Sequence, residues 1–139
     1  MGGRASDNYF FHPNEREAFS IRDKAMSGRL TLVLTPATTT TPASTVSGVS
    51  QWTRQVTATL TDGSGVVHDW FTGNLSAVVA ATSGTATGAS YLTLTNGRGT
   101  YTVTMSGTVS NAATDTLTVA PGEIEGWATA SKTSVNTYN

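Results

Sequence analysis

The chain has 139 residues, a formal net charge of −1 and no cysteine, and only 12% of its residues are charged. This length fits one domain with an extension, and the near-zero charge leaves neither a basic surface for nucleic acid nor a polybasic run for a membrane. Disulfides and thiol chemistry are excluded, and no stretch approaches the roughly 20 consecutive apolar residues of a membrane span.

Residues 1–28 are predicted to form an arm outside the main domain. A short helix is expected after Asn14, a residue that caps helices, and Gly28 is a suitable end for it. The arm is either a floppy terminus or a docking segment. We interpret it as a docking arm because exposed aromatic clusters usually meet a partner. Its aromatic residues are Tyr9, Phe10, Phe11 and Phe19.

The N-terminus does not resemble a secretory signal peptide, because its first twenty residues carry several charges and lack an apolar segment. If Met1 is the natural start, we expect the protein to be made and kept in a cytoplasm until something else releases it.

The residues after the arm predict antiparallel strands. The first covers residues 30–35 and is followed by a Thr- and Pro-rich connector at 38–45, which is either an extended linker or a crossing from one sheet to another. Residues 54–61 form the second strand, in which apolar residues alternate with threonine, the pattern of a strand with one dry face. The inward residues expected there are Val56, Ala58 and Leu60.

A turn at residues 62–65 leads into a predicted strand at 66–71, whose alternation puts one of Trp70 and Phe71 in the core and the other outside. Residues 91–95 and 99–106 are predicted to form a tight hairpin, because the Asn-Gly pair between them favours a hairpin turn. Further strands are predicted at 75–80 and, as the last of the sandwich, 116–119. Residues 123–128 could pair once more, and 129–139 are predicted to be a polar tail.

About seven strands, separated by turn signals every 8–12 residues, predict an all-β fold: an immunoglobulin-like β-sandwich of antiparallel strands with an N-terminal extended or short helical arm. The predicted division is a docking arm at 1–28, the sandwich at 29–121 and a C-terminal strand or tail at 122–139.

Residues 56–119 resemble a bacterial immunoglobulin-like domain of the invasin/intimin type. A departure from the family lies at 68–71, where a Pro-Val-Pro-Gly-like segment is usual. The matching segments are Val56-Thr57-Ala58-Thr59-Leu60-Thr61-Asp62, the Gly65 turn, Ser83-Gly84-Thr85-Ala86-Thr87, Leu94-Thr95-Asn96-Gly97-Arg98-Gly99-Thr100-Tyr101-Thr102-Val103-Thr104 and Asp115-Thr116-Leu117-Thr118-Val119.

Such domains occur as repeats in surface adhesins and as accessory modules on tailed-phage particles. A single copy with an aromatic arm and no export signal is more similar to a phage virion component, so the resemblance implies a head-decoration or head/tail accessory subunit assembled in the host cytoplasm. Its expected partners are other capsid or tail proteins and copies of itself. The alternative is a cell-surface or glycan-binding adhesion module. The residues predicted to contact partners are Tyr9, Phe10, Phe11, Phe19, Ile124 and Trp127.

No enzymatic activity, cofactor or metal is predicted. His68 and Asp69 follow Ser64, but neighbouring strand residues point to opposite faces, so Asp69 does not orient His68 for a catalytic triad. His68 is instead expected on the wet face of its strand. The three acids Asp62, Asp69 and Asp115 lack the spacing of a calcium loop.

A sugar-stacking platform is a weaker alternative, because core or subunit contact is the commoner role of such aromatic residues; a weak glycan contact stays open. The candidate platform residues are Trp70, Phe71, Tyr91 and Trp127.

Overall fold

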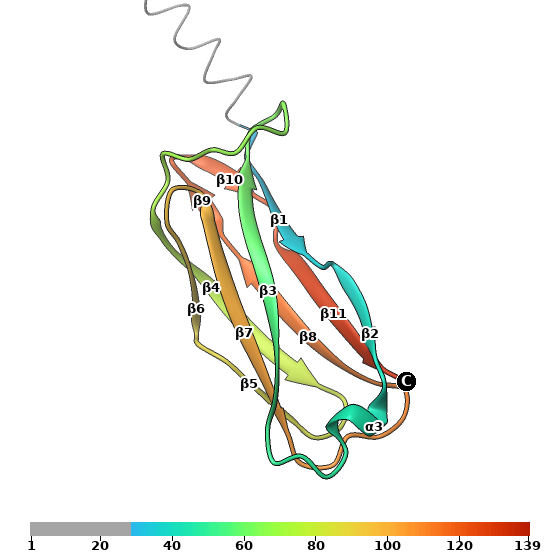
Figure 1. Ribbon diagram of the computed structural model, residues 1–139. Coiled ribbons are helices and arrows are strands. Elements are labelled where there is room, and N and C mark those ends of the chain that lie inside the picture. Colours follow the sequence, from blue (N-terminus) through green and yellow to red (C-terminus); the bar gives the residue numbers. More distant parts are fainter. Residues whose placement is uncertain (1–28) are drawn as a thin grey trace, which may run out of the picture.

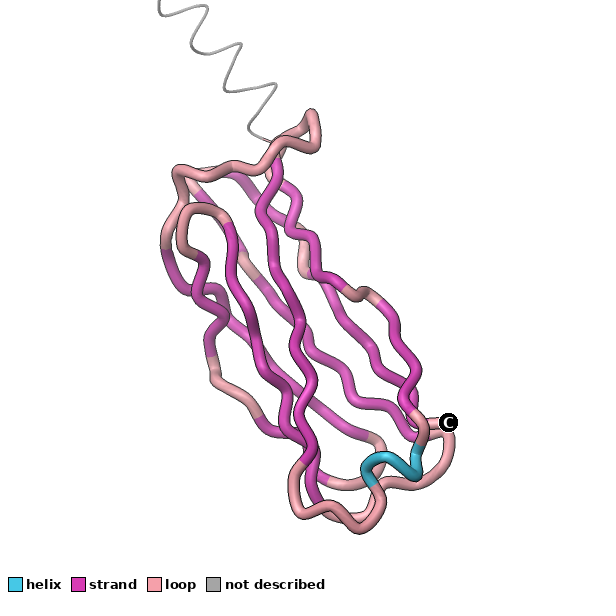
Figure 2. The backbone as a smooth tube through the Cα atoms, viewed as in Figure 1, coloured by secondary structure: helices cyan, strands magenta, loops and turns pink. Residues whose placement is uncertain are grey.

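The described chain forms two β-sheets packed face to face, together with a small separate hairpin at one end (Figure 1). The computed structural model describes residues 29–139. Strands make up the walls of both layers, and the connecting loops gather at the two ends, as Figure 2 shows. The all-β sandwich predicted from the sequence is confirmed.

The first sheet has four strands and the second has five. In hydrogen-bonded order, the first sheet consists of β1 (Thr31–Thr35), β3 (Trp52–Thr61), β7 (Arg98–Ser106) and β5 (Thr85–Thr87). The second consists of β2 (Thr38–Thr41), β11 (Lys132–Tyr138), β8 (Ala113–Ala120), β4 (Gly73–Ala81) and β6 (Tyr91–Leu94). The hairpin pairs β9 (Gly122–Ile124) with β10 (Trp127–Thr129), and one helical turn, α3 (Ala43–Val46), lies at the opposite end.

The interior consists of alternate side chains of the strands, because every second residue of a strand points between the sheets. Val56, Ala58 and Leu60 of β3 are fully buried, as predicted. The main apolar cluster spans both sheets and includes Ile124 of the hairpin. A second cluster under α3 closes the other end; its buried members are Val46, Met105, Val109, Ala113 and Tyr138.

The connector after the first strand crosses between the two sheets. β1 pairs antiparallel with β3, whereas β2 pairs in parallel with β11 in the other sheet. Pro36 stands between β1 and β2, after a cis peptide bond. Proline has no backbone N–H to donate to a sheet, which suits a point where the chain leaves one sheet for the other. Of the two readings of this connector, the crossing is confirmed.

The predicted strand at residues 66–71 is wrong. Only Val67 makes an isolated bridge, to Thr61, and the rest of the segment crosses the end of the sandwich as a loop. Part of its backbone is hydrogen-bonded to neighbouring segments: the His68 N–H donates to the Leu60 carbonyl at 2.8 Å, and the Phe71 carbonyl accepts from the Gly97 N–H at 2.8 Å. Local hydrogen bonds to the end of β3 and to a turn therefore replace a regular ladder.

The predicted hairpin between residues 91 and 106 is correct in its turn and wrong in its pairing. Thr95 and Arg98 exchange both backbone hydrogen bonds around Asn96 and Gly97, which have positive φ. Beyond this bridge the two strands separate, because β6 pairs with β4 and β7 pairs with β3. The tight turn thus joins the two sheets instead of two neighbours in one sheet.

The prediction of a polar tail is wrong for residues 132–138. They form β11, which lies between β8 and β2 in the five-stranded sheet. Its inward residues Ser134, Asn136 and Tyr138 are fully buried. The predicted extra pairing at 123–128 is confirmed by the β9–β10 hairpin, in which Trp127 is opposite Ile124. The described part therefore has eleven strands, more than the seven predicted.

Candidate functional site

The charged side chains of the described residues gather at one end of the sandwich. Apart from a buried pair, Arg54 and Asp115, they lie where β3 ends, where β7 begins and around the β9–β10 hairpin (Figure 1). Arg29, the first described residue, comes just before β1, which begins at the same end, opposite the last residue of β3. The charged residues at this end are Arg29, Asp62, Asp69, Arg98, Glu123, Glu125 and Lys132. We call this region the charged end.

A stacked aromatic pair lies at the charged end. The Trp70 indole is 75% exposed and stacks on the His68 imidazole, with ring centroids 5.1 Å apart and planes inclined by 15°. His68 itself is only 8% exposed, so its expected position on the wet face is wrong. Phe71 packs against the core while Trp70 faces solvent, which confirms that these two residues divide between inside and outside.

Glu125 fixes the His68 ring. The His68 Nε2–H donates to the Glu125 Oε1 at 3.0 Å, because a carboxylate oxygen accepts hydrogen bonds. Glu125 stands in the turn of the β9–β10 hairpin, where it and Gly126 have positive φ. The two residues are 57 positions apart in the chain, and no spacing rule in the sequence relates them. Sequence reasoning missed this contact for that reason.

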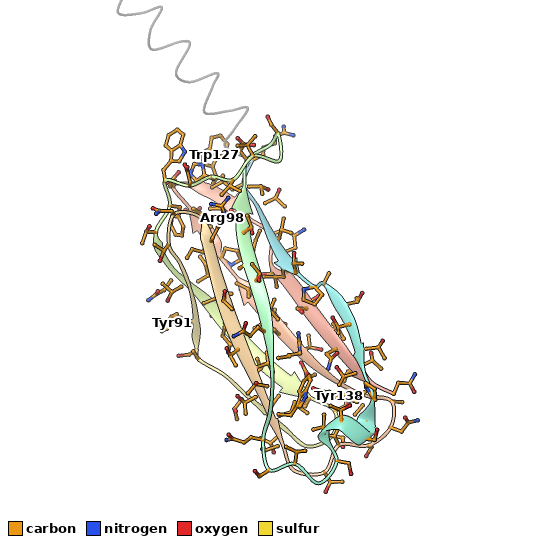
Figure 3. All side chains as sticks on the ribbon, in the orientation of Figure 1. Tyr91, Arg98, Trp127 and Tyr138 are labelled. Carbon is orange, nitrogen blue, oxygen red and sulfur yellow. The ribbon has the colours of Figure 1, made fainter. Side chains whose placement is uncertain are left out.

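The predicted partner-binding residues fall into three groups. Ile124 is 2% exposed and belongs to the apolar core of its own chain, so its side chain is covered. Trp127 is partly exposed at the charged end, on the same side of the molecule as Arg98 and far from Tyr138 (Figure 3). The remaining four, Tyr9, Phe10, Phe11 and Phe19, lie outside the described residues.

A buried ion pair joins the two sheets. Arg54 of β3 donates from Nε to the Asp115 Oδ1 at 2.8 Å and from Nη2 to the same oxygen at 2.6 Å. Its Nη1 donates to the Ser134 Oγ at 3.1 Å. The Tyr138 hydroxyl donates to the other Asp115 oxygen, Oδ2. Each charge is thereby paired and hydrogen-bonded, which burial of charged groups requires.

This network is a structural clamp, since nearly all of its surface is buried between the sheets. Asp115 is fully buried, and the Arg54 side chain is 7% exposed. Burial, together with the hydrogen bond to Asp115, raises the pKa of the Tyr138 phenol well above its ordinary value. Tyr138 also meets the Trp52 ring edge to face, at a centroid distance of 5.8 Å. The clamp therefore links β3 of the four-stranded sheet to β8 and β11 of the five-stranded sheet, in the part of the sandwich nearer to α3.

The three acids weighed as a calcium site do not converge. Asp62 accepts backbone hydrogen bonds from Ser64 at 2.8 Å and Val66 at 3.0 Å within its own turn, whereas Asp115 belongs to the buried clamp. Within residues 29–139, no group of three or more His, Asp or Glu residues is placed to hold a metal ion.

Comparison of the chain with protein-family models found no match, and comparison with curated protein sequences found none either. No helix in the described range, 29–139, is long and apolar enough to cross a membrane.

Proposed function

We propose that this protein is a non-enzymatic structural subunit of a tailed-phage virion, a head decoration or a head/tail accessory protein. It docks through residues 1–28 and displays an immunoglobulin-like sandwich. One observation carries the proposal: residues 30–138 supply both apolar clusters and both sheets of the sandwich. We infer that another subunit covers the aromatic residues of the N-terminal segment, because clustered aromatic side chains outside the main domain usually meet a partner.

The strand order supports an immunoglobulin-like fold. Such sandwiches place strands A, B, E and D in one sheet and G, F and C in the other. Here the four-stranded order β1-β3-β7-β5 corresponds to A-B-E-D, and β11-β8-β4 corresponds to G-F-C. The division of the first strand between β1 and β2, with β2 parallel to β11, is a common feature of these folds. β6, which pairs with β4, is an addition at the sheet edge.

The distribution of charge supports docking at the charged end. This end carries every charged side chain of the described residues except the Arg54–Asp115 pair, and it also holds the partly exposed Trp127 and the first described residue, Arg29. The opposite end, around α3 and residues 82–84 and 107–112, consists of uncharged residues. Charged and aromatic groups give an interface its orientation and its specificity. Many copies on a symmetric particle would add avidity, so each contact can be weak.

The proposal is tested by incorporation into particles. Phage particles would be produced from genomes that encode the natural chain, a chain lacking residues 1–28, or the double variant Phe10→Ser/Phe11→Ser. Mass spectrometry of density-purified particles then measures the copies of the protein per particle. The matched control is Tyr91→Ser, an exposed aromatic on the wall of the sandwich. We expect full incorporation of the natural chain and the control, and loss of the other two. Absence of the natural chain from the particles would refute the proposal.

A glycan-binding adhesion module is the second candidate, favoured by the exposed Trp70 on its His68 support. The two functions are separable by experiment, because an adhesion module binds its glycan as an isolated protein and need not enter a particle.

A further inference from the structure

We propose that the free face of the Trp70 indole is a stacking site for an uncharged sugar ring, with the carboxylates of Asp69 and Glu125 as hydrogen-bond acceptors beside it. The site requires only the isolated sandwich, so it does not depend on assembly into a virion.

The exposure of Trp70 is the first argument. At 75% it is the most exposed of the large apolar side chains in the described chain; the next, Val78 and Val66, are 62% and 61% exposed. An indole offers 150–250 Å² of surface whose burial is favourable, of the order typical for aromatic residues. The neighbouring Phe71 already supplies the core contact of this loop. Trp70 therefore contributes little to the interior of its own chain.

The fixed orientation of the indole is the second argument. One face rests on His68, which leaves the other face free. His68 is held at its backbone by Leu60 and at its ring by Glu125. The turn at residues 96–97 packs closely against the His68 backbone because residue 97 is a glycine: a Cβ at that position would lie 2.4 Å from the His68 carbonyl oxygen. A platform held in place before binding loses little conformational entropy when a ligand arrives, which raises its affinity.

The chemistry of the surroundings selects the ligand class. A pyranose ring presents a face of C–H groups, which suits the negative face of an aromatic ring, and a rim of hydroxyl donors. Asp69 is exposed and directly precedes Trp70 in the chain, and only one oxygen of Glu125 is engaged by His68. Small-ligand sites typically combine apolar and aromatic side chains with a small number of polar groups that fix the ligand's orientation. The charged end carries four acidic and three basic side chains, so it does not favour uronic or sialic acids, and the ligand expected is a neutral hexose or N-acetylhexosamine polymer.

The exposed Trp70 indole is too small an anchor for a stable protein interface by itself, and its size matches a single sugar ring. A stable protein interface buries on the order of 1,000 Å² or more, with several anchors around a centre. The sheet walls next to this end present mainly threonine side chains on their outer faces. A single ring gives weak binding, and display in many copies would raise it.

The test is a titration of the isolated natural chain with neutral oligosaccharides of glucose, galactose, mannose and N-acetylglucosamine, and with oligogalacturonate as the anionic comparison. Ligand-observed NMR reports contact with the sugar protons, and tryptophan fluorescence reports saturation. We expect at least one neutral sugar to saturate and oligogalacturonate not to.

Four variants locate the site. Trp70→Ala should weaken binding by about tenfold or more, and Trp70→Phe should weaken it less, because a smaller ring still stacks. His68→Ala should also weaken binding, since the indole then loses its support. Tyr91→Ala, another exposed aromatic, should leave binding unchanged. Circular dichroism confirms that each variant folds.

The inference is overturned if no neutral sugar saturates the natural chain, or if Trp70→Ala binds as well as the natural chain. Binding that Tyr91→Ala abolishes and Trp70→Ala preserves would place the contact on the sheet wall instead. Failure here leaves the virion proposal intact, because that proposal is measured by incorporation of variants in residues 1–28.

Discussion

Removal of the Asp115 carboxylate should destabilise the protein more than removal of any exposed charge. In Asp115→Ala, the buried guanidinium of Arg54 loses the oxygen that accepts both its Nε and Nη2 hydrogen bonds. The Tyr138 hydroxyl loses its acceptor in the same step. Both donors remain largely buried between the sheets, and the charge of the guanidinium is left without its counter-ion.

The structure sets the size of the effect. Breaking a buried ion pair by removal of one partner costs about 3–5 kcal/mol, because the other charge is left uncompensated. A domain of this size has a free energy of unfolding of about 5–15 kcal/mol, so the variant should lose roughly a fifth of it or more. At about 4 °C per kcal/mol, the melting temperature should fall by roughly 12–20 °C.

Urea denaturation followed by circular dichroism measures this loss. If the slope of the unfolding free energy against urea concentration is unchanged, the variant and the natural chain expose the same surface area on unfolding. Asp69→Ala is the matched control, an exposed acid whose loss should change stability by less than about 0.5 kcal/mol. The double variant Arg54→Met/Asp115→Leu should recover most of the loss, because it removes both buried charges. A loss below about 1 kcal/mol in Asp115→Ala would refute the structural role of the pair.

Three further predictions concern the fold. Burial raises the pKa values of Tyr101 and Tyr138. The contribution of the two neutral phenols to stability is therefore complete below the ordinary tyrosine pKa of about 10 and is lost as the pH rises above it. A pH series of urea denaturation curves should show a smaller loss of stability at high pH for Tyr138→Phe than for the natural chain. Gly97→Ala should lower the free energy of unfolding by about 1–3 kcal/mol more than Gly65→Ala; both residues have positive φ, but only at Gly97 would the new Cβ meet backbone, and equal losses would contradict this. A chain that ends at residue 131 should show no cooperative unfolding transition by circular dichroism, because it lacks the strand between β8 and β2; a transition like that of the natural chain would contradict this.

The sequence predicted strands well where the inward residues are apolar. In β3, Val56, Ala58 and Leu60 alternate with threonine, and in β4 Leu75 and Ala77 are buried in the same way. It failed for β11, whose buried face consists of Ser134, Asn136 and Tyr138. That face is polar because it packs around the Arg54–Asp115 pair, and a pattern of apolar residues cannot reveal a strand that buries polar ones.

The pairing of strands and the site at the charged end depend on contacts between distant residues. The turn at Asn96 and Gly97 was recognisable from its residues, but turn chemistry does not determine which sheet each strand then joins. The alternation at Trp70 and Phe71 left open which of them faces solvent. The support of Trp70 by His68, and of His68 by Glu125, arises only when the loop and the hairpin meet in three dimensions.

An image of the assembled particle at side-chain resolution tests the central claim most directly: a sandwich with its own complete core, joined to a segment that another subunit covers. We predict sandwiches on the particle surface with Phe10 and Phe11 buried against a neighbouring protein. If these side chains instead lie against their own sandwich, with no neighbour touching them, the docking function is contradicted.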